Sequence, residues 1–394
     1  MNEEPDVFAA NKCYPEAKDL FFSGYQSLAD VRDSCLVVLD TNALLVPYGI
    51  SKNGLAEIES TYQPLAATNR LVVPGQVARE FAKNRPFKIG DIFQAISRKQ
   101  NIASPKKGRY PMLDELPTYE RVRELESQIG TLIAEYRDEI GKLLDHIKTW
   151  NWDDPVSNLY SKLFPASVVD PVLKEGEIRE RLSYLKNNKL PPGYKDAGKL
   201  DDGVGDLLVW KAAVQVAEER KLPVVLVSGD SKSDWFYRSE GQPLFPRYEL
   251  VDEIRRVTDG KSFHIVSFAK FLELFGATAA AVEEARTEEV RIDLSTMSSY
   301  GRNSILASMA EQAVANWINT KYVHLEISRD DRIGGIILSE PGGAAALISV
   351  KYHPASQRRS VHSRIRETLV RFERLYNDEK WGICLLYTSP SPRD

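Results

Sequence analysis

Short apolar runs alternate with stretches of helical periodicity along the first part of the chain. The runs rich in β-branched residues are predicted as buried parallel strands, and they are Cys35–Asp40, Leu71–Pro74, Val224–Ser228 and Phe263–Val266. The segments predicted as helices are Gln76–Lys83, Asp206–Arg220, Tyr248–Val257 and Phe268–Phe275. Strands that alternate with helices indicate an α/β fold with a parallel sheet flanked by helices.

A long segment between the second and third predicted strands, about residues 86–190, has helical periodicity instead. Apolar residues recur there at the spacing of one helix face, notably Val122, Leu125, Ile129, Ile133, Ile140 and Leu144. We therefore predict a mostly helical insertion within the α/β domain.

The pattern changes again after the Ala-rich, acidic stretch 277–289, which is predicted as a linker or helical bridge. The elements expected beyond it are a helix, three strands and a second helix, at Ser304–Asn319, Val323–Ser328, Gly335–Ser339, Ala345–Tyr352 and Val361–Tyr376. This order predicts a smaller α/β domain at the C-terminal end. The expected division is therefore a first domain at 1–276, a linker at 277–299 and a second domain at 300–383.

The last residues, Cys384–Asp394 (CLLYTSPSPRD), read like the translation of a sequencing adapter. We expect this tail to be an artefact without regular structure, and the second domain to be truncated near Ile383.

Composition narrows the class of protein without identifying a function. Hydrophobic residues at 43% and charged residues at 27% are typical of a folded protein. The net charge of −4 gives no overall attraction to nucleic acid, so such contact requires a local basic surface. Cys13, Cys35 and Cys384 have no zinc-site spacing. The chain has no signal-like leader and no apolar stretch of about 18 residues, so we expect a cytoplasmic protein with no membrane contact.

Four acidic residues stand at positions that a parallel sheet brings together. Asp40 and Asp230 end predicted strands, Glu80 lies on the helix after the second strand, and Asp206 begins the helix before the next one. Ligand sites lie outside the carboxyl ends of such strands, so the four carboxylates are expected to meet. Because like charges at close range repel, a cation is required, and oxygen ligands suit Mg²⁺ or Mn²⁺. The chemistry expected of such a site is phosphodiester hydrolysis.

Each acid taken singly also has an ordinary structural interpretation. Asp40 and Asp230 are reasonable turn or cap residues, and Asp206 is a reasonable acid at a helix start. Glu80 has the pattern of a solvated helical residue. The order of the four along the chain is what favours a common site.

Five segments in order resemble the motifs of bacterial PIN-like domains with a long helical insertion, over roughly residues 18–276. They are Val38–Leu45 (VLDTNALL), Val73–Phe81 (VPGQVAREF), Pro191–Asp196 (PPGYKD), Gly205–Trp210 (GDLLVW) and Val227–Trp235 (VSGDSKSDW).

The resemblance implies a metal-dependent nuclease acting on RNA or single-stranded DNA, with toxin, phage-defence and RNA-processing roles left open. It places the metal-binding and catalytic acids at Asp40, Glu80, Asp206 and Asp230. Asp196 and Asp234 are further candidate metal ligands, and the implied hydrogen-bonding groups around the site are Thr41, Asn42 and Ser228. The sequence departs from the family at Gly229, where relatives often carry another Asp.

Basic residues near these motifs are candidates for contact with phosphates. Lys195, Lys199 and Lys232 flank the acids. A second basic group lies between Arg79 and Arg109, where a solvated helix face is the alternative interpretation, and comprises Arg79, Lys83, Arg85, Lys88, Arg98, Lys99, Lys106, Lys107 and Arg109. Trp235 is expected in the core rather than against a base, and His264 is expected to be a hydrogen-bonded core residue.

The second domain has an order of elements similar to that of restriction-endonuclease-like domains. Gly334, Gly335 and Ser349 stand where the metal-binding acids of that fold are expected, which leaves Lys351 without carboxylate partners. A degenerate binding module is therefore predicted.

Two rival interpretations apply to the first domain. A phosphatase of the haloacid dehalogenase type requires a second Asp two residues after the first, and Asn42 occupies that place. An inactive PIN-like scaffold that binds nucleic acid or protein is the other rival, favoured by Gly229.

Overall fold

The computed structural model describes residues 5–21, 24–105, 108–171, 174–195, 203–229, 232–239, 242–296, 314, 316–318, 320, 326–330, 335–339, 345–352 and 381–388. The chain divides into two units, Met1–Glu289 and Val290–Asp394. Within the described ranges, no helix has the length and apolar character needed to cross a membrane.

Most of the helices in the described part of the chain lie in the first unit. The α-helices are α1 (Ala9–Cys13), α2 (Leu28–Val31), α3 (Thr41–Leu45), α4 (Lys52–Ala67), α5 (Gly75–Arg98), α6 (Pro117–Lys148), α7 (Pro155–Leu163), α8 (Glu175–Asn187), α9 (Val204–Arg220), α10 (Tyr248–Val257), α11 (Phe268–Leu274) and α12 (Ala279–Thr296). Short 3₁₀ helices are η1 (Ala17–Phe21), η2 (Val46–Gly49) and η3 (Pro111–Leu113). The strands are β1 (Leu36–Leu39), β2 (Leu71–Pro74), β3 (Val168–Val169), β4 (Val224–Val227), β5 (Phe236–Ser239), β6 (Gln242–Pro246) and β7 (Phe263–Val266).

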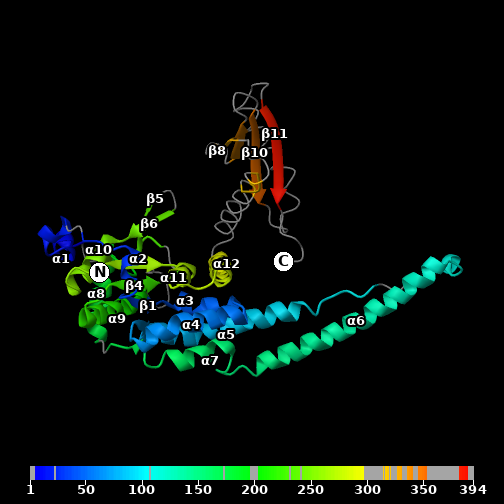
Figure 1. The fold of residues 1–394 in the computed structure, drawn as a ribbon, viewed down its shortest axis with the longest axis horizontal. Helices are drawn as coiled ribbons and strands as arrows, with labels where there is room; N and C mark the ends of the chain where they lie inside the picture. The colour runs from blue at the N-terminus through cyan, green and yellow to red at the C-terminus, as the bar shows by residue number, and fades with distance from the viewer. Residues whose placement is uncertain are drawn as a thin grey trace. The chain divides into compact units, whose positions relative to one another are not determined.

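A parallel five-stranded sheet of order β3-β2-β1-β4-β7 forms the centre of this unit (Figure 1). The predicted parallel α/β sheet flanked by helices is therefore confirmed. β1 pairs with β4 over its whole length, from Leu36 opposite Val224 to Leu39 opposite Val227. Both strands are buried throughout, as continuous apolar runs predict for strands covered on two faces.

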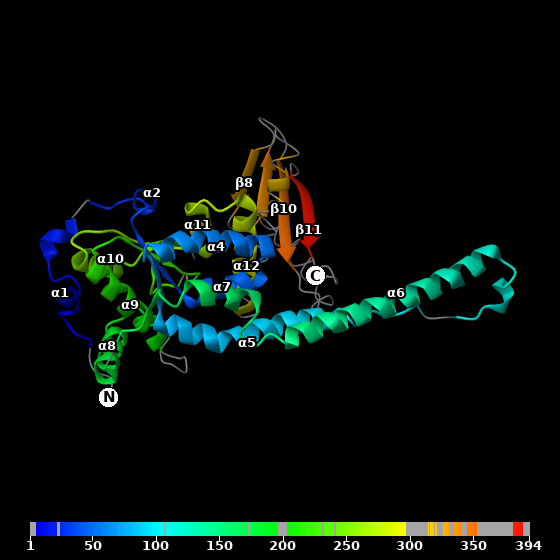
Figure 2. The same ribbon diagram turned by 60° about the horizontal axis from the view of Figure 1, so that its bottom comes forward.

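Helices cover both faces of the sheet. On one face α9 and α10 pack on alternate strand residues, and this core includes Trp210, Trp235 and Phe263. The predicted core position of Trp235 is confirmed by its 5% exposure. On the other face α4, α7 and α11 meet through Tyr62, whose ring lies 5.6 Å from Phe164 and 5.7 Å from Phe271 between centroids. Figure 2 shows α4 and α7 side by side.

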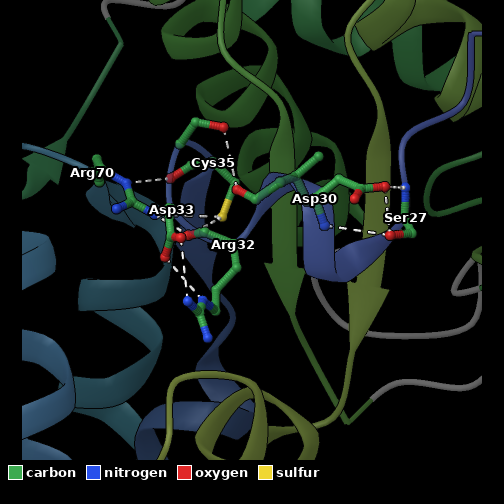
Figure 3. Close-up of polar contacts among 8 residues, drawn as sticks. Ser27, Asp30, Arg32, Asp33, Cys35 and Arg70 are labelled. Carbon is green, nitrogen blue, oxygen red and sulfur yellow. Dashed lines mark hydrogen bonds and ion pairs between the residues drawn. The ribbon is translucent and has the colours of Figure 1, made fainter.

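Polar contacts fix the chain at the amino ends of the strands, opposite the edge with the candidate acids (Figure 3). Arg70 Nε donates to the Cys35 carbonyl at 2.9 Å, and Arg70 Nη2 donates to the Arg32 carbonyl. Ser27 and Asp30 form a capping box at the start of α2. These contacts anchor β1 before it reaches Asp40.

His264 is a hydrogen-bonded core residue, as predicted. Its side chain is buried, Nδ1 lies 2.8 Å from the Tyr25 hydroxyl, and Nε2 lies 3.0 Å from the Gln26 carbonyl. Both ring nitrogens therefore have partners in the neutral form, in which Nε2 donates and Nδ1 accepts.

The insertion is mostly helical, but its start differs from the prediction. α5 continues through Pro86 to Arg98, and the insertion contributes the edge strand β3, which pairs with β2. α6 packs against α5, and its first half continues past the end of α5 in both ribbon views (Figures 1 and 2). Within the predicted apolar stripe, Ile133, Ile140 and Leu144 are buried, whereas Val122, Leu125 and Ile129 are exposed.

The predicted linker begins as part of the first unit, and the division falls at Glu289. The first part of α12 carries buried Ala281, Val282 and Ala285. Glu289 accepts hydrogen bonds from the amides of Phe268 and Ala269, at the start of α11, at 2.6 and 3.3 Å. A carboxylate at a helix start is stabilised by the unpaired amides there. Glu289 therefore serves as a cap at the start of α11.

The second unit contains a four-stranded sheet of order β11-β10-β9-β8. Its strands are β8 (Glu326–Asp330), β9 (Gly335–Ser339), β10 (Ala345–Tyr352) and β11 (Trp381–Thr388). The three predicted strands are confirmed, with the first shifted toward Asp330. The helix predicted at 361–376 lies outside the described residues, as does most of the one at 304–319.

The expectation that the tail has no regular structure is wrong for Cys384–Thr388. These residues continue β11 and pair in parallel with Ile348–Tyr352 of β10. The physical reason is that the apolar and β-branched residues at the start of the tail suit a strand. The rest of the tail, 389–394, lies outside the described residues.

Candidate active site

Asp40 stands at the carboxyl end of β1 and caps α3. Its backbone amide donates to the Val227 carbonyl at 3.0 Å, which ties it to the end of the neighbouring strand β4. Its Oδ1 accepts a hydrogen bond from the Thr41 amide at 2.7 Å, and its Oδ2 accepts one from the Ser228 hydroxyl at 2.6 Å. Asp40 can therefore cap α3 and also serve as a site residue, because the amide at the start of the helix orients its carboxylate.

Thr41 joins Asp40 to Glu80. The Thr41 hydroxyl donates to Glu80 Oε2 at 2.5 Å, while its amide serves Asp40. Glu80 Oε1 accepts a second hydrogen bond from Gln76 Nε2 at 2.9 Å. The two acids thus belong to one hydrogen-bonded group built by α3 and the first turns of α5, and Glu80 is not simply a solvated helix residue.

Asp206 lies in the first turn of α9, near a loop that carries another predicted motif. α9 leads into β4, so its start lies at the carboxyl edge of the sheet. Gly193 has a positive φ of 84°, and a Cβ there would lie 2.7 Å from the Gly203 carbonyl and 3.7 Å from Asp206 Cβ. Only glycine permits this close approach, which seats the 191–195 loop on the start of α9.

The same loop also contacts the segment after β4. The Tyr194 hydroxyl donates to the Ser233 carbonyl at 3.2 Å. Arg247, just before α10, donates to the same carbonyl at 3.4 Å and is itself ion-paired with Glu249. Asp234, a candidate metal ligand, is fully buried in this segment, beside the core residue Trp235. Tyr194 and Arg247 therefore fix the segment that follows the strand.

Gly229 lies beside Asn42. Among the described residues, the one neighbour within 4 Å of a Cβ built on Gly229 would be Asn42 Cβ, at 3.9 Å. The backbone here does not need glycine, because no positive φ applies. A Cβ would therefore fit at the position where the sequence departs from the family pattern.

The predicted meeting of four carboxylates is realised only in part by the described residues. Asp40 and Glu80 share Thr41, but no three His, Cys, Asp or Glu side chains of the described ranges gather closely enough to hold a metal ion. Asp230 and Asp196 lie outside the described residues. The convergence of all the acids on one cation stays a prediction.

The chemistry of the donor set nevertheless fits a hard divalent cation. The groups that orient the Asp40 and Glu80 carboxylates from Thr41, Ser228 and Gln76 are neutral hydroxyls and amides. Neutral donors orient a carboxylate without cancelling its charge. A carboxylate oxygen has about two lone-pair sites, so an oxygen that accepts one such bond retains capacity for a cation.

The candidate basic residues differ in exposure, and some of them are paired with an acid of the same unit. Lys99 and Lys195 are exposed, Lys232 is half-buried, and Lys106, Lys107 and Lys199 lie outside the described residues. Two arginines of the basic group have internal partners, which corrects the expectation for them. Arg79 pairs with Asp170, and Arg85 is buried and paired with Asp154.

Sequence reasoning missed Gln76, Tyr194 and Arg247 as supporting residues. Gln76 precedes Glu80 by one helical turn, and that spacing on a predicted helix is a signal for a side-chain pair. No local signal predicts the contacts of Tyr194 and Arg247, because Ser233 is distant from both in sequence.

Comparison with known proteins gives one result that bears on the site. A family profile described as "PIN like domain" matches residues 36–250, more than half of the chain. The matched range begins at β1 and includes every candidate acid. No curated protein and no solved structure matches the chain.

Proposed function

The chain belongs to the PIN-like domain family, and from that membership we propose that it is a metal-dependent nuclease. The acids assigned to the metal site are Asp40, Glu80, Asp206 and Asp230, with Asp196 and Asp234 as further candidates. The proposed cation is Mg²⁺ or Mn²⁺, and the proposed substrate is RNA, with single-stranded DNA as the alternative.

The observation that carries the proposal is that contacts connect the separate motifs in the folded chain. Thr41 of the first motif contacts Glu80 of the second, and Ser228 of the last motif contacts Asp40. The third motif contacts the fourth and the fifth, since Gly193 lies against the start of α9 near Asp206 and Tyr194 bonds the Ser233 carbonyl. Ordinary cap or surface roles for single acids do not require segments so distant in sequence to meet.

The residues of this chain orient the acids before any ligand binds. Asp40 is fixed by Thr41 and Ser228, and Glu80 is fixed by Thr41 and Gln76, so little side-chain freedom remains to be lost on binding. A divalent cation held by such carboxylates supplies charge stabilisation at the scissile phosphate and lowers the pKa of a bound water. The chain's contribution is the position and charge of its carboxylates.

The test is cleavage of labelled RNA, single-stranded DNA and duplex DNA by the full chain with Mn²⁺, Mg²⁺ or a chelator. Asp40→Asn should abolish cleavage and leave the fold intact, because it removes a charge at nearly constant volume. Asp33→Asn is the matched control, since Asp33 is an exposed carboxylate paired with Arg32 just before β1. Cleavage by Asp40→Asn at the wild-type rate defeats the assignment.

The second candidate function is an inactive scaffold that binds nucleic acid or protein. Gly229 favours it, because the family position beside Asn42 lacks its acid. Binding of RNA without cleavage under every metal condition is the outcome that selects the scaffold.

A role as a toxin or phage-defence effector in the cytoplasm is proposed on the same basis. Growth arrest on expression of the wild-type chain, and normal growth with Asp40→Asn, is the expected result. Equal growth of the strains that express the wild-type chain and Asp40→Asn contradicts the toxin role. The nuclease proposal is then decided by the cleavage test alone.

A further inference from the structure

A cavity of about 320 Å³ lies beside the first turns of α5. Its wall is mostly apolar and rich in aromatic rings, and includes Leu44, Val73, Phe81, Trp152, Tyr160 and Phe164. Ligand pockets have volumes of about 300–1,000 Å³ and combine apolar walls with few polar groups. This cavity therefore has the size and lining of a small-ligand site.

The cavity shares its framework with the candidate metal site. Phe81 directly follows Glu80 on α5, and Leu44 lies on α3, one turn after Thr41. The Tyr160 hydroxyl donates to the Leu44 carbonyl at 3.0 Å, which holds α7 against α3. The helix that Asp40 caps and the helix that carries Glu80 thus also contribute to the cavity wall.

Trp152 is the exposed aromatic residue of this wall. It is 53% exposed and has φ of 69°, a left-handed conformation that non-glycine residues rarely adopt. Strained backbone of this kind persists where the surroundings hold it, often at ligand sites. The Arg85 guanidinium lies 4.5 Å from the Trp152 ring centroid, and the Phe81 ring meets it edge-on at 6.5 Å.

The Arg85 guanidinium beside Trp152 is itself held in place by hydrogen bonds. Arg85 Nε donates to Asp154 Oδ2 at 2.9 Å and to the Ser157 hydroxyl at 2.8 Å, and Arg85 Nη2 donates to the same carboxylate at 2.6 Å. All three of these residues are buried. A buried, paired guanidinium against an exposed indole makes a rigid aromatic platform at the mouth of the cavity.

We propose that this cavity binds one nucleobase of the substrate, turned out of its stack and placed against Trp152. The inference rests on the proposed function, because a base lies one sugar away from its phosphate and the cavity wall includes Phe81, the residue after Glu80, and Leu44 of the helix that Asp40 caps. Aromatic rings bind any base through its π face, whereas the described residues of the wall offer few hydroxyls, those of Tyr160, Ser157 and Ser161. Stacking, rather than hydrogen-bond recognition, therefore dominates this site.

The experiment measures base stacking in the presence of chelator, so that no cleavage contributes. The full chain is titrated into a single-stranded oligonucleotide with one 2-aminopurine, whose fluorescence falls on stacking, and free adenosine is titrated separately by calorimetry. Wild type should quench the probe saturably and bind adenosine. A signal with the oligonucleotide but none with the nucleoside would assign the site to bases within a strand, whereas a nucleoside signal alone would overturn the substrate role.

Trp152→Gly removes the ring and suits the left-handed backbone, and an unfolding curve like that of the wild type shows that a loss of binding does not reflect misfolding. We expect about a 5- to 150-fold loss of affinity, the range for one base–aromatic stack, and recovery in Trp152→Phe. Phe87→Ala is the control, because Phe87 is an exposed aromatic on α5 outside the cavity wall. Equal binding by wild type and Trp152→Gly overturns the inference whether or not the chain cleaves RNA. Stacking that persists in a chain without cleavage overturns only the nuclease proposal.

Discussion

The Thr41 hydroxyl donates a hydrogen bond to Glu80 Oε2 at 2.5 Å. Because the amide of the same residue orients Asp40, one small side chain couples two acids that lie on different helices.

Thr41→Val should weaken metal binding without unfolding the chain. Valine keeps the shape and the amide contact to Asp40 but removes the hydroxyl, so Glu80 loses one orienting bond. Loss of such a supporting group typically costs about 10–100-fold in metal affinity or activity. The half-activating Mn²⁺ concentration of cleavage is the measurement. Thr61→Val is the control, since the buried Thr61 hydroxyl bonds the Glu57 carbonyl within α4, and an equal effect of both changes contradicts the coupling.

Gly229→Asp should strengthen the response to metal. A Cβ fits at this position, with Asn42 Cβ at 3.9 Å from it, and the new carboxylate increases the negative charge near Asp40. We expect the half-activating Mn²⁺ concentration to fall by roughly tenfold. Gly229→Ala fills the same space without charge and should leave it unchanged. A shift of the same size in both variants would identify a backbone effect instead.

Asp154→Asn should destabilise the first unit strongly. The change leaves Arg85 buried without its ionic partner, while Asn still caps α7. Breaking a buried pair in this way costs about 3–5 kcal/mol, to be measured by urea unfolding. Asp170→Asn breaks the exposed Arg79 pair instead and should cost about 0–1 kcal/mol. Similar losses in the two variants would show that burial does not decide the outcome.

The stability of the first unit should decrease below about pH 6.5 because of His264. Burial lowers the pKa of His264, and the bond to the Gln26 carbonyl only partly opposes this. The unfolded chain therefore takes up a proton before the folded chain does, so the stabilisation is complete above the unfolded pKa and is lost as the pH falls below it. His264→Gln should show a smaller decrease in unfolding free energy between about pH 7.5 and about pH 5.5. Parallel pH profiles would exclude His264 as the cause.

Replacing Lys99, Lys106 and Lys107 together by Ala should weaken RNA binding and flatten its salt dependence. Each lost contact to single-stranded phosphate lowers the slope of log K against log salt by about 0.7, so three contacts lower it by about 2. Replacing Lys142, Lys148 and Lys174 is the matched control, because each is exposed and paired with an acid on its own helix or in the next turn. If the salt dependence of RNA binding is unchanged when Lys99, Lys106 and Lys107 are replaced, the basic group is an ordinary solvated surface.

Much of the sheet was predictable from sequence because its strands are buried on both faces, and continuous apolar runs such as Val224–Val227 mark them directly. The position of Asp40 at the carboxyl edge followed from the same pattern. β3 was not predictable, since its two residues are too few for any periodicity. The pairing of Arg79 and Arg85 was equally hidden, because their partners lie 91 and 69 residues away. The cavity has no sequence signal, as its wall comes from several separate elements.

The edge strand β3 determines which parts of the long insertion a protein engineer can alter. The chain leaves the sheet along α5 and is hydrogen-bonded into it again at Val168 and Val169, so excising the whole insertion would remove a strand along with the Asp154 and Asp170 partners of α5. The first half of α6, by contrast, contributes no strand to the sheet. Removing whole turns from this half of α6 shortens the helix by about 1.5 Å per residue. The first half of α6 can therefore serve as a spacer of adjustable length, whereas the rest of the insertion has to be kept.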